Sequence, residues 1–313
     1  MSLAFTFPGQ GSQAVGMGAE LAEAFAAARE VFQEIDDALG QNLSKLMREG
    51  PTEDLTLTEN AQPALMAVSL AAVRVLKVEF NVDMSRAGFV AGHSLGEYSA
   101  LAAAEALALA DTARLLKLRG QAMQRAVPVG QGAMASLIGP RADVALAEAA
   151  AAAGAEVGVC VVANDNNAGN VVISGAKLAV DRAIEKAKEL GARAILLNVS
   201  APFHCPLMQP AAEEMAEALA AAAIAPPRAP VVANVTARPV LEPEVIRRLL
   251  VEQVTGRVRW RESVEWMAGE GGVDRFAELG PGKVLTGIAK RIAPDAEALA
   301  LNTPADLEAF AKL

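Results

Sequence analysis

Cysteine and histidine are scarce in this chain, which has 313 residues but only two of each. The cysteines, Cys160 and Cys205, are too few for a disulfide framework, and no cysteines and histidines have the spacing of a metal site. We therefore expect reduced thiols and no structural metal.

The chain also lacks excess positive charge and long apolar runs. Its net charge is −9 at pH 7, whereas a general nucleic-acid binder needs concentrated lysine and arginine to neutralise phosphates. No uncharged stretch approaches the length of a membrane span, and residues 1–7 lack the basic start of a secretory signal. Because 53% of the residues are hydrophobic, disorder is excluded. The sequence predicts a globular cytoplasmic protein that binds neither nucleic acid nor membrane.

Strand and helix patterns alternate along the chain, which predicts an α/β fold with a largely parallel central sheet. A first strand at residues 3–7 leads into a glycine-rich turn, and helical patterns follow from about residue 20 to 46. Residues 133–199 instead show the order β-α-β-β-α-β, which is typical of a ferredoxin-like unit. We predict a large subdomain, residues 1–126 and 200–313, and a small ferredoxin-like subdomain, residues 127–199.

Gly92-His93-Ser94-Leu95-Gly96 lies between an apolar strand pattern and an alanine-rich helical pattern. Strand, glycine-flanked serine and helix are the plan of a nucleophile elbow, in which the serine is exposed beside helix N–H groups that stabilise an oxyanion. The motif alone also arises by chance in glycine-containing loops, but its position between strand and helix favours the elbow. Ser94 is therefore the candidate nucleophile.

A nucleophilic serine needs a base, and the chain offers only His93 and His204. His93 precedes Ser94 directly, and adjacent side chains diverge at a sharp elbow. His204 follows a predicted strand in a loop-like segment, where a sheet delivers catalytic groups. We expect His204 to be the general base and acid, and Cys205, a rival nucleophile by type, to be a packed small residue.

Arg119 lies on the apolar face of a predicted helix that starts at Asp111, the expected N-cap. A guanidinium turned inward needs an anionic or hydrogen-bonding partner, because unpaired burial is costly. Periodicity leaves two alternatives open. Arg119 forms a structural ion pair with a buried acid, or it binds the carboxylate of a substrate.

Taken together, these motifs resemble the malonyl-CoA:acyl carrier protein transacylases of bacterial type II fatty-acid synthesis. The resemblance spans nearly the whole chain in order, and it implies a hydrolase-like α/β core with a ferredoxin-like insertion. The matching segments are residues 7–13, 61–64, 92–100, 119–120, 132–135, 163–166, 203–204 and 278–285.

The family pattern implies roles for individual residues. Ser94 would attack the malonyl thioester with His204 as base, the Leu95 N–H and a Gln10 group would hold the oxyanion, and Arg119 would hold the malonyl carboxylate. The backbone carbonyl of Arg259, where relatives often have glutamine, would orient the histidine.

Three further positions match the family near the acyl pocket, namely Gln62, Asn164 and Phe203, although Gln62 and Asn164 could equally be turn or cap residues. The bulk of Phe203 is expected to disfavour an α-methyl branch on the substrate.

The resemblance further implies a monomer without a cofactor, which uses malonyl-CoA and an acidic acyl carrier protein. Its carrier would bind basic residues near the cleft, for which the candidates are Arg257, Arg259, Arg261, Lys283, Lys290 and Arg291. The alternatives are a stand-alone acyltransferase of a polyketide pathway, a serine thioesterase or hydrolase, and a non-catalytic carrier-binding module. No acid with a clear claim on His204 lies between Ser94 and His204, which speaks against a hydrolase.

Overall fold

The centre of the molecule is a six-stranded sheet in the computed structural model, which describes residues 2–313. The strand order is β10-β9-β1-β2-β7-β8, and all pairs are parallel except β7 with β8. The bounds are β1 Leu3–Phe7, β2 Phe89–Gly92, β7 Val231–Ala233, β8 Arg238–Val240, β9 Arg275–Leu279 and β10 Glu297–Leu301.

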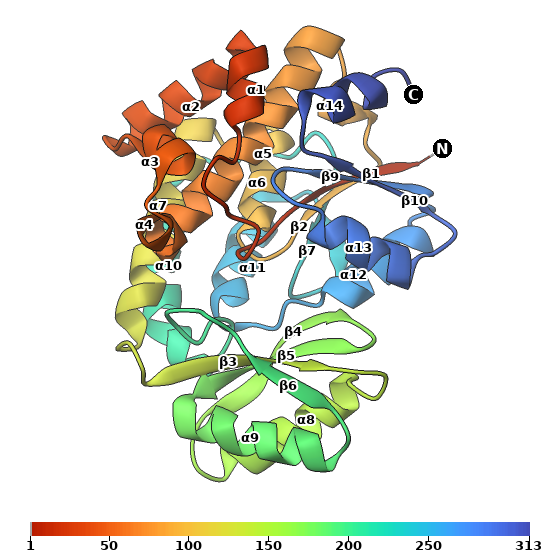
Figure 1. Ribbon diagram of the computed structural model, residues 1–313. Helices are drawn as coiled ribbons and strands as arrows, with labels where there is room; N and C mark the ends of the chain where they lie inside the picture. Colours follow the sequence, from red (N-terminus) through yellow and green to blue (C-terminus); the bar gives the residue numbers. More distant parts are fainter. Residues whose placement is uncertain (1) are drawn as a thin grey trace.

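Helices cover both faces of this sheet (Figure 1). Side chains alternate along β1, so that Phe5 and Phe7 pack into a core with the helices around α5, whereas Ala4 packs with α12 and α13 on the opposite face. The helices outside the small sheet are α1 Ala19–Ala24, α2 Ala26–Leu39, α3 Leu43–Glu49, α4 Thr52–Thr56, α5 Thr58–Phe80, α6 Gly96–Ala103, α7 Leu109–Ala126, α10 Gln209–Ala221, α11 Pro243–Thr255, α12 Trp260–Ala268, α13 Val284–Ile292 and α14 Pro304–Phe310, with short 3₁₀ turns η1 Met84–Arg86 and η2 Pro206–Met208. None of the helices within residues 2–313 is long and apolar enough to cross a membrane.

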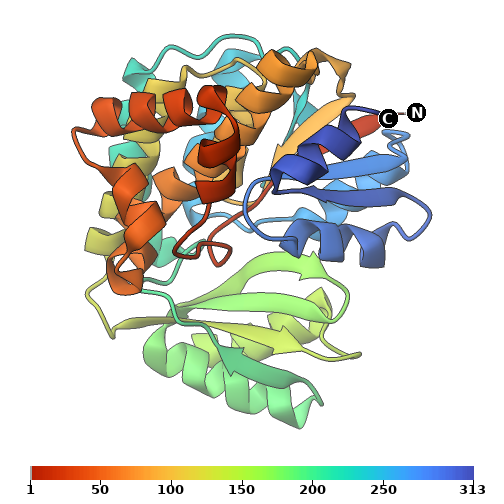
Figure 2. The same cartoon turned by 45° about the horizontal axis from the view of Figure 1, so that its top comes forward.

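A second, antiparallel sheet has the strand order β4-β5-β3-β6 and lies beside the first (Figure 2). Its strands are β3 Gly132–Ile138, β4 Cys160–Asn167, β5 Asn170–Ala176 and β6 Arg193–Leu196, and its helices are α8 Val144–Ala155 and α9 Lys177–Glu189. The helices share a separate alanine-rich core with this sheet. The α/β fold with an inserted β-α-β-β-α-β unit is thus confirmed, while the proposed subdomain boundaries at 127 and 199 stay a prediction.

The predicted start of α7 is wrong. The helix begins at Leu109 with Ala108 as N-cap, and Asp111 lies in its first turn. The Asp111 carboxylate accepts a hydrogen bond from Arg114 at 3.0 Å instead of capping a backbone N–H. An acid suits the first turn of a helix as well as its cap, so this position alone did not fix the boundary.

Candidate active site

The Gly92–Gly96 segment forms a tight turn between β2 and α6. Ser94 has a φ of 53°, which is a strained conformation for a residue with a side chain. A Cβ on Gly92 would lie 1.8 Å from the Gly96 carbonyl oxygen, and one on Gly96 would lie 2.3 Å from that of Phe7. Both flanking positions therefore require glycine, and the packing presents the serine at the carboxyl end of the sheet.

His204 faces Ser94 directly. Its Nε2 lies 2.7 Å from the Ser94 Oγ, and its Nδ1 lies 2.9 Å from the backbone oxygen of Gln253. A carbonyl oxygen only accepts hydrogen bonds, so Nδ1 carries the proton and Nε2 presents a lone pair to the serine hydroxyl. The pair has the geometry of a nucleophile with its base.

The backbone carbonyl that orients His204 belongs to Gln253, so the expectation for Arg259 is wrong. The Arg259 carbonyl is taken up at the start of α12, where it accepts hydrogen bonds from the N–H and hydroxyl of Ser263 at 3.0 and 2.9 Å. The Arg259 side chain forms an ion pair with Glu262, at 2.5 Å. Because Arg259 directly precedes α12, its carbonyl accepts hydrogen bonds from the first turn of that helix and does not orient His204.

Burial sets the charge state of His204. Desolvation, followed by the positive charge of Arg119, lowers the pKa of this imidazole to about 3. The side chain is only 3% exposed. At neutral pH the histidine is therefore uncharged and able to accept the serine proton.

Arg119 is buried beside this pair without a carboxylate partner. Its Nη1 donates to the Gln62 Oε1 and its Nη2 to the Gln253 Oε1, both at 2.8 Å, while Nη2 also lies 3.2 Å from the Ser94 Oγ. Its Nε is buried without a hydrogen-bond partner, and no ion pair to Arg119 is present within residues 2–313. The alternative of a structural ion pair is therefore wrong, and the guanidinium retains donors for an anion.

Two backbone N–H groups beside Ser94 have no hydrogen-bond partner within residues 2–313. Within the described residues, neither the Gln10 nor the Leu95 N–H donates a hydrogen bond. The Ser94 N–H differs, because it donates to the Asn234 Oδ1 at 2.7 Å. The side chain of Gln10 donates to the Thr58 hydroxyl at 3.3 Å, which leaves its backbone group as the free donor.

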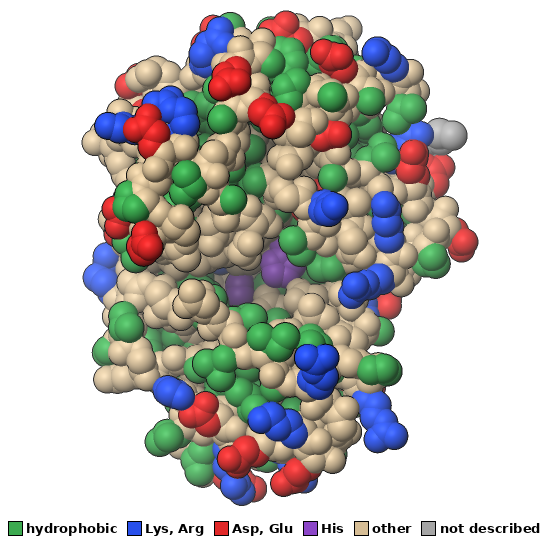
Figure 3. All heavy atoms as spheres, in the orientation of Figure 1, with side chains coloured by type: hydrophobic (Ala, Val, Ile, Leu, Met, Phe, Trp, Pro, Cys, Tyr) green, Lys and Arg blue, Asp and Glu red, His purple; other side chains and the backbone are tan. Residues whose placement is uncertain are grey.

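A cavity of about 290 Å³ brings the expected residues together between the two sheets. Figure 3 shows histidine side chains inside this hollow. His93 also lines it, but its Nε2 is 2.9 Å from the Asn166 Oδ1 rather than facing Ser94. Of the residues expected in the site, the cavity is lined by Gln10, Gln62, Ser94, Leu95, Arg119, Asn164, Phe203 and His204.

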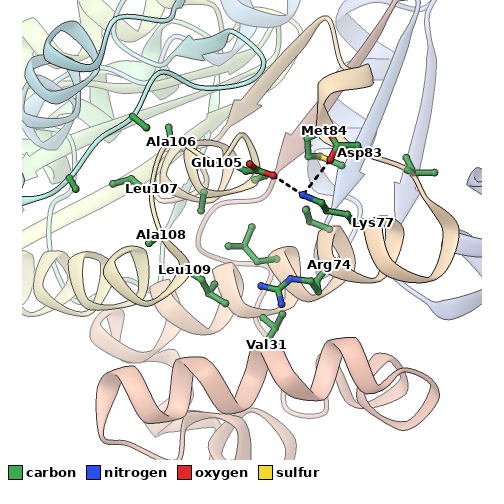
Figure 4. A pocket seen from close by; sticks show the side chains of 17 residues that line it. Val31, Arg74, Lys77, Asp83, Met84, Glu105, Ala106, Leu107, Ala108 and Leu109 are labelled. Carbon is green, nitrogen blue, oxygen red and sulfur yellow. Dashed lines mark hydrogen bonds and ion pairs between the residues drawn. The ribbon is translucent and has the colours of Figure 1, made fainter.

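A second groove lies among α2, α5 and the segment after α6 (Figure 4). Three of its charged side chains pair with one another, because Lys77 lies 2.7 Å from Glu105 and 3.4 Å from Asp83, while Arg74 lies 3.9 Å from Glu34 outside the groove. Neither histidine lines this groove, whereas His93 and His204 both line the cavity beside Ser94. Within residues 2–313, no group of three or more histidine, cysteine or acidic side chains is placed to hold a metal ion.

The model of the acyl transferase domain family matches residues 4–301. The chain belongs to the acyl transferase family. Relatives named malonyl CoA-acyl carrier protein transacylase include one from Haemophilus influenzae, 46% identical over 98% of this chain and 97% of the relative, and one from Escherichia coli, 46% identical over 99% of each.

Solved acyltransferase structures agree with this assignment. The acyl-carrier-protein S-malonyltransferase from Bartonella henselae is 54% identical, with a TM-score of 0.96 over 100% of this chain and 99% of its own. A malonyl-transacylase in complex with a type II PKS acyl-carrier protein is 43% identical, with a TM-score of 0.95 over 100% of this chain and 99% of its own.

Sequence reasoning missed three polar residues around the acyltransferase site, namely Glu97, Asn234 and Gln253. Gln253 could have been found, because it lies on the buried face of α11 with Leu249 and Leu250, which is the signal that identified Arg119. Asn234 directly follows the short strand β7 and gave no comparable signal.

Proposed function

We propose that this acyltransferase moves the malonyl group from malonyl-CoA to the phosphopantetheine thiol of an acyl carrier protein. The observation that carries the proposal is the buried guanidinium of Arg119, which has no carboxylate partner within residues 2–313 and lies 3.2 Å from the Ser94 hydroxyl. A malonyl group carries its carboxylate one methylene away from its reacting carbonyl, so an acyl group on Ser94 would bring that carboxylate close to the guanidinium. The names of the relatives support the same substrate and acceptor.

In the first half-reaction, the Ser94 Oγ attacks the thioester carbonyl carbon while its proton passes to the His204 Nε2. The carbonyl oxygen becomes an oxyanion, for which the free Gln10 and Leu95 N–H groups are the proposed donors. The intermediate then collapses, the C–S bond breaks, and CoA takes the proton from the histidine. The malonyl group remains as an ester on Ser94.

In the second half-reaction, the carrier thiol gives its proton to His204, and its sulfur attacks the malonyl ester. The C–O bond to Ser94 breaks, and the serine oxygen recovers a proton from the imidazole. We propose that Arg119 holds the malonyl carboxylate throughout, with Gln62 supporting the guanidinium and Asn164 and Phe203 shaping the acyl pocket. The reaction needs no cofactor.

For the carrier, the six basic candidates divide into two groups. Arg257, Arg259 and Arg261 form ion pairs with acids of this chain. Lys283 and the α13 residues Lys290 and Arg291 are exposed and have no ion pair within residues 2–313. Gly282 also lies near Ser12, in the loop that lines the cavity. Figure 3 shows basic side chains beside the hollow on the α12–α13 side, so we propose these three as the carrier contact.

The malonyl group is proposed to supply fatty-acid elongation. One observation favours the alternative of a polyketide pathway, since a similar malonyl-transacylase is known with a type II PKS carrier. A thioesterase is less favoured, because a backbone carbonyl rather than a carboxylate orients His204. The cytoplasmic location and the monomeric state stay predictions.

Intact-protein mass spectrometry tests the proposal. Wild-type protein mixed with malonyl-CoA is expected to gain a malonyl group that the carrier removes, and Ser94→Ala to gain none. Arg119→Ala is expected to load malonyl about 100-fold more slowly, while keeping its ability to load acetyl-CoA. No adduct on the wild type, or an adduct that water removes faster than the carrier does, would support a hydrolase instead.

A further inference from the structure

Glu97 is a buried acid close to the reacting groups that has no step in the mechanism above. It lies in the first turn of α6 and is 3% exposed. Its Oε2 accepts hydrogen bonds from the Gln253 Nε2 at 2.9 Å and from the Asn234 N–H at 3.1 Å. A carboxylate this deep in the protein is costly, so its retention beside the site calls for a reason.

The Gln253 side chain links this acid to the substrate-binding guanidinium. Its Nε2 donates to Glu97 and, at 2.9 Å, to the Ser94 backbone oxygen, and its Oε1 accepts from Arg119 at 2.8 Å. The amide cannot be reversed, because a guanidinium only donates and a carbonyl oxygen only accepts. Glu97 and Ser94 therefore fix which end of Gln253 faces Arg119.

An amide between acid and guanidinium has a different effect from a direct ion pair. A carboxylate in contact with Arg119 would occupy the donors that a substrate carboxylate needs and would neutralise the charge in place. The Gln253 amide instead anchors one guanidinium nitrogen, and Gln62 anchors another, at 2.8 Å each. The guanidinium is thus held rigidly while it remains able to bind an anion.

We propose that Glu97 is a positioning residue for carboxylate recognition, which holds the Arg119 guanidinium in place through the Gln253 amide. The inference rests on the proposed malonyl transfer. It assigns part of the selection for malonyl over acetyl groups to Glu97, a residue of α6. It requires that Glu97 affect acyl groups with a free carboxylate and leave acetyl groups nearly untouched.

The charge of Glu97 adds a pH dependence to this role. Burial raises the pKa of Glu97 to about 7 against the lowering effects of the Gln253 and Asn234 hydrogen bonds and the Arg119 charge. The ionisable groups that interact with it are Arg119 on α7 and Tyr98 on α6, whereas β7 and α11 present the uncharged Asn234 and Gln253. Ionised Glu97 offsets the Arg119 charge, so malonyl binding favours the protonated acid.

The test compares loading of malonyl-CoA and acetyl-CoA by wild type, Glu97→Leu and Glu97→Gln. Glu97→Leu removes one of the two acceptors of the Gln253 Nε2 and leaves the Ser94 backbone oxygen as the other, and we expect the malonyl-to-acetyl ratio of kcat/KM to fall at least tenfold. In an Arg119→Ala background, Glu97→Leu is expected to have no further effect on malonyl loading. Equal losses for both substrates, or additive losses in the double variant, would reduce Glu97 to a structural role and overturn the proposal.

Glu97→Gln keeps an acceptor oxygen but does not titrate, so it decides the question if the leucine variant fails to fold. From pH 6 to 8 we expect the kcat/KM of Glu97→Gln for malonyl-CoA to remain level. Over the same range the wild-type kcat/KM for malonyl-CoA is expected to fall several-fold, whereas the wild-type kcat/KM for acetyl-CoA is not. Identical pH profiles of wild type and Glu97→Gln would overturn the proposal. If the wild type loads no malonyl group at all, the proposed function itself fails.

Discussion

The backbone oxygen of Gln253 accepts a hydrogen bond from the Nδ1 of His204 at 2.9 Å, in the position where a serine hydrolase has a carboxylate. A neutral carbonyl fixes the tautomer and orientation of the imidazole but adds no negative charge to stabilise an imidazolium. The imidazole of His204 is therefore held in place without the nearby negative charge that raises histidine pKa values. Its low pKa follows from burial and from the nearby positive charge of Arg119.

This arrangement predicts that the rate of Ser94 acylation does not fall at mildly acidic pH. With the pKa of His204 lowered to about 3, the imidazole stays neutral as the pH falls from 7 to 5, so the loading rate is expected to persist over that range. An unperturbed histidine would lose its lone pair near pH 6.5. Rapid-quench loading with acetyl-CoA measures this without the titration of Glu97. A midpoint near pH 6.5 would contradict the prediction.

The close approach at the elbow predicts that Gly92→Ala destabilises the fold by more than about 4 kcal/mol or prevents folding, because the new Cβ would meet the Gly96 carbonyl oxygen at 1.8 Å. Gly287→Ala is the matched control. Gly287 lies inside α13, and beyond its chain neighbours and the backbone of its own helix no atom lies within 4 Å of its added Cβ, so we expect a gain of about 0.5–1 kcal/mol. Urea unfolding followed by circular dichroism compares them. Equal stabilities would show that the turn relaxes around a side chain.

The contact between Ser94 and His204, the proposed catalytic pair, could be predicted from the sequence because each residue has a recognisable local pattern. The glycines around Ser94 mark a turn that other residues cannot form, and only His204 remained as a base once adjacency removed His93. Arg119 was visible as a charge on an apolar helix face. These signals are local, and the structure places all three residues in one cavity.

The groups that support the pair were harder to predict, because backbone atoms carry no sequence signature. The carbonyl that orients His204 comes from α11, and nothing in the residue type of Arg259 or Gln253 distinguishes their carbonyls. The Glu97 to Gln253 link depends on how α6 and α11 meet in space, which periodicity within either helix does not specify. Long-range packing decides such contacts.

The three cations at the start and in the last turn of α13, which form no ion pair in the part of the chain that the structure describes, predict a salt-dependent carrier interaction. Reversing the charges of Lys283, Lys290 and Arg291 to glutamate is expected to raise the KM for the carrier about tenfold at low salt, without changing malonyl-CoA loading. Arg86→Glu is the control, because Arg86 is an exposed cation at the opposite end of β2 from Ser94. It lies in η1, which precedes β2, whereas Ser94 follows that strand. Steady-state transfer at several salt concentrations measures the difference. An unchanged KM in the triple variant would exclude this contact.

Phe203 is expected to restrict the shape of the acyl group that the cavity accepts. Its side chain is 8% exposed and lines the cavity next to His204, the proposed base. Phe203→Ala opens space there, and accommodation of one methyl group is worth about 1–3 kcal/mol, so we expect the methylmalonyl-to-malonyl ratio of kcat/KM to rise by about 10-fold or more. Phe203→Leu should give a smaller rise because it removes less volume. Loading measured by mass spectrometry with both thioesters decides this. A ratio that stays constant across the series would mean that the α-carbon of the substrate points away from Phe203.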